Sequence, residues 1–99
     1  MMQLDNDLKE IAIDLIIHFI NDGTIKESKN ALASMGLPLQ IVEKFPGMIY
    51  DSTAAAISII TREKEYNDVI EALSRQGAKK LDVMYLVDLS LDTVKKNTI

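Results

Sequence analysis

The chain has no cysteine and no tryptophan, and its aromatic residues are two phenylalanines and three tyrosines. The lack of cysteine excludes disulfides, thiolate metal sites and cysteine nucleophiles, and it fits a reducing cytoplasm. His18 is the only histidine, and it has Asp14 at helical spacing but no third group, so the sequence offers neither a Ser-His-Asp triad nor a histidine-based zinc site. Gly-rich phosphate loops are missing too. We therefore expect no enzymatic activity and no bound cofactor or metal.

Signals for a membrane or for secretion are also weak. The longest apolar stretch, residues 11–20, is interrupted by Asp14 and His18 and is shorter than the roughly 20 residues that a membrane span needs. The N-terminus carries acidic residues where a signal peptide carries basic ones. The sequence therefore predicts a cytoplasmic protein without a membrane partner.

Aliphatic side chains must build the core, because hydrophobic residues make up 47% of the chain and aromatic residues only 5%. A chain of this length buries about two-thirds of its unfolded surface, which is enough for one domain. Aliphatic cores with few aromatic residues suit helices packed on helices. The pattern predicts a single all-α domain over residues 1–99.

The acidic charge is concentrated in the first half of the chain. The net charge is −4. Residues 1–51 carry eight acidic and four basic side chains, whereas residues 52–99 carry equal numbers of each. An acidic protein repels phosphate at long range, which disfavours non-specific binding of nucleic acid. This distribution favours a protein partner over a nucleic acid.

Three helices are expected in the first half. Asp5 or Asn6 caps a first helix that runs to about Asn21, with Gly23 after its end. Its apolar face follows the i, i+3, i+4 spacing of a helix, and comprises Leu8, Ile11, Ala12, Leu15, Ile16, Phe19 and Ile20. A second helix over residues 24–35 begins with a capping box. Pro38 starts a short third helix, which Pro46-Gly47 is expected to break.

A longer helix is expected from Thr53 to Gln76, with Gly77 after its end. The rival interpretation makes Ala55–Thr61 a strand, because three of its residues are β-branched isoleucines. A lone strand needs a partner, and no other segment alternates in the same way. Helix is therefore the preferred prediction.

The last quarter of the chain, residues 79–97, has the pattern of two short helices. A tight turn is expected at Asp88-Leu89, and Ser90 is expected to cap the second helix. Residues expected to face inward are Leu81, Met84, Tyr85, Leu89 and Val94. The chain as a whole is then predicted to form about six helices, arranged as two helix-turn-helix-like units joined by a long central helix.

The two predicted units resemble each other. Residues 5–45 and 59–97 each run from a helix through a glycine to a short helix, a turn with leucine and another short helix. In this comparison Gly23 corresponds to Gly77, and Leu37 to Leu89. The pattern indicates an internal repeat, although it matches no established repeat signature.

The last quarter of the chain contains the run Asp82-Val83-Met84-Tyr85-Leu86-Val87, followed by Leu89-Ser90-Leu91-Asp92-Thr93-Val94-Lys95. This segment resembles the helix-turn-helix of LuxR-type transcription regulators. This resemblance covers about 15 residues of the chain, and it implies that the second helix enters the major groove of DNA. Together with the basic edge before it, it indicates a set of DNA-contacting residues: Lys79, Lys80, Ser90, Thr93, Lys95, Lys96 and Asn97. The alternative is that residues 95–97 are solvated side chains at a helix C-terminus, where cations are favoured.

Two functions follow from these observations. The first is a small regulatory protein that binds DNA, as a homodimer because one short recognition helix reads few bases. The second is an acidic all-helical module that binds another protein as an adaptor or inhibitor, of the kind that phages and mobile elements encode, without contacting nucleic acid.

Overall fold

The structure, a computed structural model, describes residues 6–22, 33–34, 36 and 38–97. This part of the chain forms four α-helices and contains no strand: α1 (Asn6–Asp22), α3 (Leu39–Ile60), α4 (Tyr66–Ser74) and α5 (Lys80–Asn97). The all-α prediction is confirmed, but the predicted six helices are wrong. Of the predicted helix over residues 24–35, Ala33 and Ser34 are helical and the rest lies outside the described residues.

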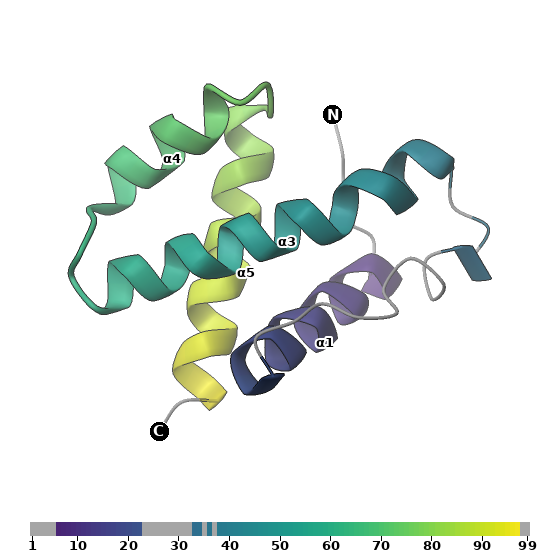
Figure 1. Cartoon of the computed structure of the whole chain (residues 1–99), viewed down its shortest axis with the longest axis horizontal. Coiled ribbons are helices and arrows are strands. Elements are labelled where there is room, and N and C mark those ends of the chain that lie inside the picture. The colour runs from purple at the N-terminus through teal and green to yellow at the C-terminus, as the bar shows by residue number, and fades with distance from the viewer. Residues whose placement is uncertain (1–5, 23–32, 35, 37, 98–99) are drawn as a thin grey trace.

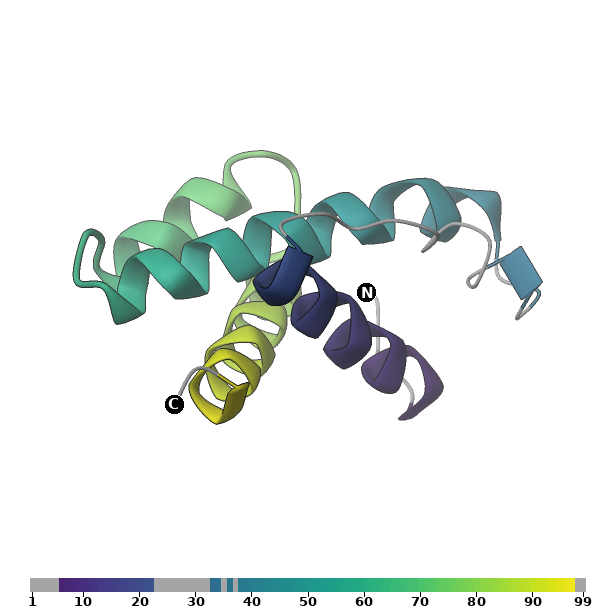
Figure 2. The same ribbon diagram turned by 60° about the horizontal axis from the view of Figure 1, so that its bottom comes forward.

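Helices α3 and α5 cross at the centre of the molecule (Figure 1). Helix α1 packs against both of them, beside the C-terminal half of α5. Helix α4 packs mainly on the N-terminal half of α5 and touches α3 much less. The turned view shows α1 and α4 on different sides of the α3–α5 crossing (Figure 2).

The buried side chains fall into two clusters. The larger cluster joins α1, α3 and α5 through Leu8, Ala12, Leu15, Ile16, Val42, Phe45, Ile49, Leu86 and Val94. The smaller cluster joins α4 to α5 through Ile70, Val83 and Val87. Helix α5 is therefore the element that both clusters share.

The prediction for the first helix is confirmed, because α1 ends at Asp22, within one residue of the predicted end. Four residues of its predicted apolar face are buried, namely Leu8, Ala12, Leu15 and Ile16. This face could be predicted because a helix that packs on one side places its apolar residues at a spacing of three or four.

The predicted break at Pro46-Gly47 is wrong, because α3 runs through both residues. An internal proline costs a helix about 3 kcal/mol, since it removes one backbone hydrogen bond and crowds the preceding turn. Phe45 and Ile49, on either side of Pro46, are both fully buried. Burial of two such side chains contributes roughly 3–6 kcal/mol. Packing on both sides of the proline therefore offsets its cost.

The predicted helix over residues 53–76 is interrupted, because α3 ends at Ile60 and α4 begins at Tyr66. The Arg62 N–H donates to the Ile59 carbonyl at 3.1 Å, and the Glu63 N–H donates to the Ser58 carbonyl at 2.9 Å. This is the hydrogen-bond pattern of a Schellman helix end, in which residue 62 takes a left-handed conformation with φ of +63°. Glycine usually occupies that position, so an arginine there gave no stop signal.

Residues 55–60 are helical, so the preference for helix over a strand is confirmed. After α4 ends at Ser74, Gly77 has a φ of +102°, which suits glycine and places it after the helix as predicted. The end of α4 was therefore readable from the sequence, whereas the end of α3 was not.

The predicted turn at Asp88-Leu89 is wrong, because α5 is one continuous helix. Ser90 is consequently no N-cap, and its side chain is buried in the middle of α5. Leu81 and Tyr85 were expected to face inward, yet 66% and 45% of their surfaces are exposed. Val83, Leu86 and Val87 face inward instead. Leu89 and Val94 pack in the larger cluster as predicted.

The correction to α5 affects the predicted architecture of two similar units. The second unit contains one helix after Gly77 rather than a helix pair. In the first unit, the predicted short helix from Pro38 to Phe45 continues into α3. Gly23 and Leu37, which anchor the comparison with the second unit, lie outside the described residues.

Candidate functional site

The residues predicted to contact DNA separate into a buried group and an exposed group. Ser90 and Thr93 are buried, with exposed fractions of 0% and 4%. The Thr93 hydroxyl donates to the Leu89 carbonyl at 2.8 Å, within its own helix. The other five are exposed: Lys79, Lys80, Lys95, Lys96 and Asn97. The surface therefore presents only part of the predicted set.

The exposed lysines lie at opposite ends of α5 rather than in one patch. Lys80 and Lys95 are fifteen positions apart in the helix, which corresponds to about 22 Å along the axis. Lys96 forms an ion pair with Asp92 at 3.0 Å. The Asn97 side-chain amide donates to the Thr93 carbonyl at 2.8 Å. Residues 80–97 form one helix and no helix-turn-helix. DNA binding and dimer formation therefore stay predictions.

Ser90 has a further peculiarity: its buried hydroxyl has no hydrogen-bond partner among the described residues. The hydroxyls of Thr53, Ser74 and Thr93 each donate to the carbonyl four residues earlier, at 2.7, 2.7 and 2.8 Å. An unsatisfied buried hydroxyl costs roughly 1–3 kcal/mol. Ser90 therefore weakens α5 at the centre of the molecule.

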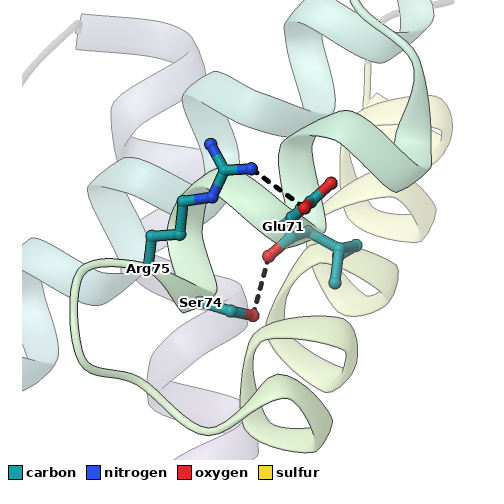
Figure 3. Close-up of polar contacts among 4 residues, drawn as sticks. Glu71, Ser74 and Arg75 are labelled. Atoms are coloured by element: carbon teal, nitrogen blue, oxygen red, sulfur yellow. Dashed lines mark hydrogen bonds and ion pairs between the residues drawn. The ribbon is translucent and has the colours of Figure 1, made fainter.

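Replacement of Ser90 by alanine should raise the free energy of unfolding by about 1 kcal/mol or more, since the unpaired hydroxyl is removed and alanine favours helix. The measurement is urea denaturation followed by circular dichroism. Ser74→Ala is the matched control, because its hydroxyl is bonded to the Ile70 carbonyl at 2.7 Å (Figure 3). We expect that control to change stability by less than about 0.5 kcal/mol. A loss of stability in Ser90→Ala would show that the hydroxyl is satisfied.

Asp88 ties α5 to α4 instead of forming a turn. The Tyr66 hydroxyl donates to the Asp88 Oδ1 atom at 2.8 Å. Burial, and then the hydrogen bond and the negative charge of Asp88, raise the pKa of Tyr66 above its usual value of 10.0. All three causes favour the neutral phenol. The contact therefore holds the N-terminus of α4 against the middle of α5.

This contact predicts a loss of stability in alkaline solution. Because the pKa of Tyr66 is raised by folding, the stabilisation is complete below pH 10.0 and is lost as the pH rises through the folded-state pKa. Wild type should exceed Tyr66→Phe in stability by up to about 1 kcal/mol near neutral pH. The difference should shrink above pH 10.0. Urea midpoints of both proteins across this range test it, and a constant difference would contradict it.

A long groove runs along one face of α3. Three cavities lie in a row there, with volumes of about 570, 130 and 540 Å³. Asp51 and Gln76 line all three, so the cavities adjoin one another. The α3 wall is formed by residues at helical spacing: Glu43, Lys44, Gly47, Met48, Asp51, Ala54, Ala55 and Ser58. We call this feature the α3 groove.

Comparison with known proteins does not assign the groove. No protein family, curated protein or solved structure gives a significant match to the chain. The function must therefore be argued from the geometry of the chain itself.

The second wall of the α3 groove comes from α4 and from the link between α4 and α5. The cavity of about 540 Å³ lies between α3 and α4, and its α4 side is lined by Asp68, Val69, Ala72 and Leu73. The groove stays open because α4 packs on α5 through Ile70, and touches α3 only lightly. Helices α3 and α4 are neighbours in the chain, but the turn after Ile60 directs α4 onto α5 and away from α3.

The central cavity of the α3 groove is a small pit that reaches toward the core. Its volume is about 130 Å³. Apolar side chains line it, namely Met48, Leu73, Ala78, Val83 and Leu86, and Val83 and Leu86 belong to the two core clusters. Asp51, Gln76 and Ser52 supply the polar part of the lining. The groove thus combines an open channel with one deeper apolar hole.

Among the described residues, Asp51 is the only ionisable one that lines the pit. Its side chain is exposed, and it forms no ion pair with the part of the chain that the structure describes. Asp51 therefore presents an available carboxylate at the middle of the groove.

A second depression lies on the other side of α4. Its volume is about 390 Å³, and it is lined by Tyr66, Asn67, Ile70, Glu71, Ser74, Lys80 and Met84. Arg75 and Glu71 form an exposed ion pair at 2.9 Å beside it (Figure 3). Leu81 and Tyr85 are the exposed apolar residues of the adjoining α5 segment. Ile70 of the smaller core cluster also lines this depression, but the depression lies away from Asp51 and Gln76.

The described residues contain no group of three potential metal-ligating side chains. None of the four described helices is both long and apolar enough to span a membrane. The sequence analysis missed the α3 groove, because its residues are ordinary small and polar ones. The run Ala54-Ala55-Ala56 was the available signal, since small residues leave room beside a helix.

Proposed function

We propose that this protein is a non-catalytic interaction module that binds a helix of a protein partner in the α3 groove. The observation that carries the proposal is the row of three adjoining cavities with a mainly apolar pit at its centre. Recognition of an amphipathic helix by a hydrophobic groove is a recurring mode of protein binding. It requires a channel of helical length and an anchoring hole, and the groove offers both.

The dimensions of the groove match a helix of the partner. From Glu43 to Ser58 the α3 wall extends for about 22 Å, the length of a helix of about 15 residues. Helix axes pack 8–10 Å apart depending on the side chains between them, and small side chains permit the closer approach. Ala54, Ala55 and Ala72 are the small residues of the walls.

Charge also favours a protein over DNA. The net charge of −4 opposes approach to phosphate. Asp88 and Asp92 are exposed on α5 between Lys80 at its start and Lys95 and Lys96 near its end. The lining of the groove carries four acidic residues (Glu43, Asp51, Asp68 and Asp82) and three basic ones (Lys44, Lys64 and Lys79), so it offers no basic surface for a nucleic acid backbone.

Selection from a displayed library of helical peptides tests the proposal, with the full chain as the target. Bound peptides are then measured by fluorescence anisotropy against wild type and against Ala72→Arg, which obstructs the groove from an exposed position. Asn67→Arg is the matched control, because it adds the same side chain to the other side of α4. We expect Ala72→Arg to weaken binding at least about tenfold and Asn67→Arg to leave it unchanged.

Two results would overturn the proposal. One is that the selected peptides bind wild type and Ala72→Arg equally. The other is that no peptide binds, while a mixed-sequence DNA duplex binds at low salt and the double substitution Lys95→Glu, Lys96→Glu abolishes this binding. The second result would support the DNA-binding alternative instead.

A further inference from the structure

The α3 groove also indicates what its partner looks like. We infer that the partner helix places one apolar side chain, of leucine or phenylalanine size, in the pit and a lysine or arginine about one turn away against Asp51. This inference rests on the proposed function, because it describes the occupant of the same groove. It identifies the partner as a cationic amphipathic helix.

The volume of the pit sets the size of the anchor. The pit holds about 130 Å³. An apolar cavity of about 150 Å³ in another protein stays dry and binds benzene. A side chain with a similar volume, such as leucine or phenylalanine, therefore fits the pit, whereas alanine would leave most of it empty. Anchors that fill desolvated holes near the centre of an interface supply most of the binding energy.

The chemistry of the pit walls sets the type of anchor. Met48, Leu73, Val83 and Leu86 offer no charged group to the interior of the pit. A polar anchor placed among them would lose its hydrogen bonds to water without replacing them. Gln76 lies in the lining beside Asp51, where an amide can bond to polar groups of the partner. The anchor should therefore be apolar up to the rim.

Asp51 sets the charge of the neighbouring residue. A helix that covers the groove removes water from the Asp51 carboxylate, which lines all three cavities. A carboxylate that is buried without a partner is strongly unfavourable, so an apolar or acidic neighbour would oppose binding. A lysine or arginine at this position restores the lost interaction. Lys44, Lys64 and Lys79 line the outer two cavities, so the requirement for a cation applies at the pit, where Asp51 is the charged residue of the lining. The net charge of −4 also attracts a cationic helix at long range.

The spacing of the two groups follows from their positions. Asp51 lines the pit itself, so the anchor and the cation must lie on the same face of the partner helix. Residues three or four positions apart are neighbours on one helix face. The expected signature is an apolar residue with a lysine or arginine three or four positions away.

The experiment uses peptides of about 15 residues selected from a displayed helical library against the full chain. The selected sequences should share the anchor-and-cation signature. Ala78→Leu should weaken the binding of these peptides at least about tenfold, because the larger side chain fills the pit from its lining. Ala78→Ser, which keeps the residue small, should leave the affinity within about threefold. Thermal denaturation of each variant confirms that it is folded.

A charge exchange tests the role of Asp51. Asp51→Lys should weaken binding at least about tenfold, and a peptide in which the cation is changed to glutamate should recover the affinity for that variant. Glu10→Lys is the matched reversal, because Glu10 is exposed on α1 and does not line the groove. It should change the affinity far less, through long-range charge alone.

The possible outcomes separate the two proposals. If Ala72→Arg abolishes binding while Ala78→Leu and Asp51→Lys do not, the groove binds helices but the inferred anchor and cation are wrong. If none of the three substitutions weakens binding, both proposals are wrong. Loss of binding in Ala78→Leu, together with recovery by charge exchange at Asp51, supports both.

Discussion

Replacement of Leu91 by proline is expected to lower the free energy of unfolding by at least about 3 kcal/mol. Leu91 lies inside α5, eleven residues after the first residue of the helix, Lys80. Proline there removes the backbone hydrogen bond to the Val87 carbonyl and crowds the preceding turn. Because both core clusters depend on α5, a break at this position separates side chains that the rest of the molecule packs against.

This substitution distinguishes the continuous helix from the predicted pair of helices. If Ser90 capped a second helix, residue 91 would be its first residue, where proline is well tolerated. Leu91→Ala is the control for the lost side chain, since Leu91 packs partly buried against the smaller cluster. Urea denaturation followed by circular dichroism gives the stability of both variants. Equal stabilities for Leu91→Pro and Leu91→Ala would indicate a turn before residue 91.

Phe45→Ala should cost about 3–5 kcal/mol, the usual loss when a buried phenylalanine is truncated. Phe45 is fully buried and packs in the larger cluster between α1 and α5. A domain of this size has a total stability of about 5–15 kcal/mol. The substitution should therefore remove a large share of it. It should also remove part of the packing that keeps α3 helical through Pro46.

Leu39→Ala is the control on the same helix, because 69% of Leu39 is exposed. It should change the free energy of unfolding by less than about 0.5 kcal/mol. Urea titration and thermal denaturation measure both variants. If the two substitutions cost the same, Phe45 does not pack in the core.

The corrected helix boundaries share one physical cause. Proline at position 46 and serine at position 90 both resemble local stop or start signals, yet each lies inside a helix. Local preferences of this kind are worth about 1–3 kcal/mol. Burial of neighbouring side chains such as Phe45 and Leu86 is worth as much or more. The end of α3 shows the opposite: the helix does end there, but Arg62 occupies the left-handed position where a glycine would have signalled the end.

The α3 groove could not be predicted from the sequence. Its walls come from α3, α4 and the link before α5, and they face each other only because α4 turns back onto α5. Asp51 and Gln76 are 25 positions apart in the chain and have no motif in common. Nothing in local spacing indicates that these two side chains line the same pit.

Local sequence was sufficient for the features that depend on helical periodicity. These are the all-helical class, the helical state of residues 55–60 and the buried face of α1, because a spacing of three or four is visible within a few turns. Packing between helices decided the continuity of α5, the passage of α3 through Pro46, the exposure of Leu81 and the opening of the groove. Those features depend on packing between residues that are far apart in the chain. The free energy of that packing cannot be predicted from a local sequence pattern.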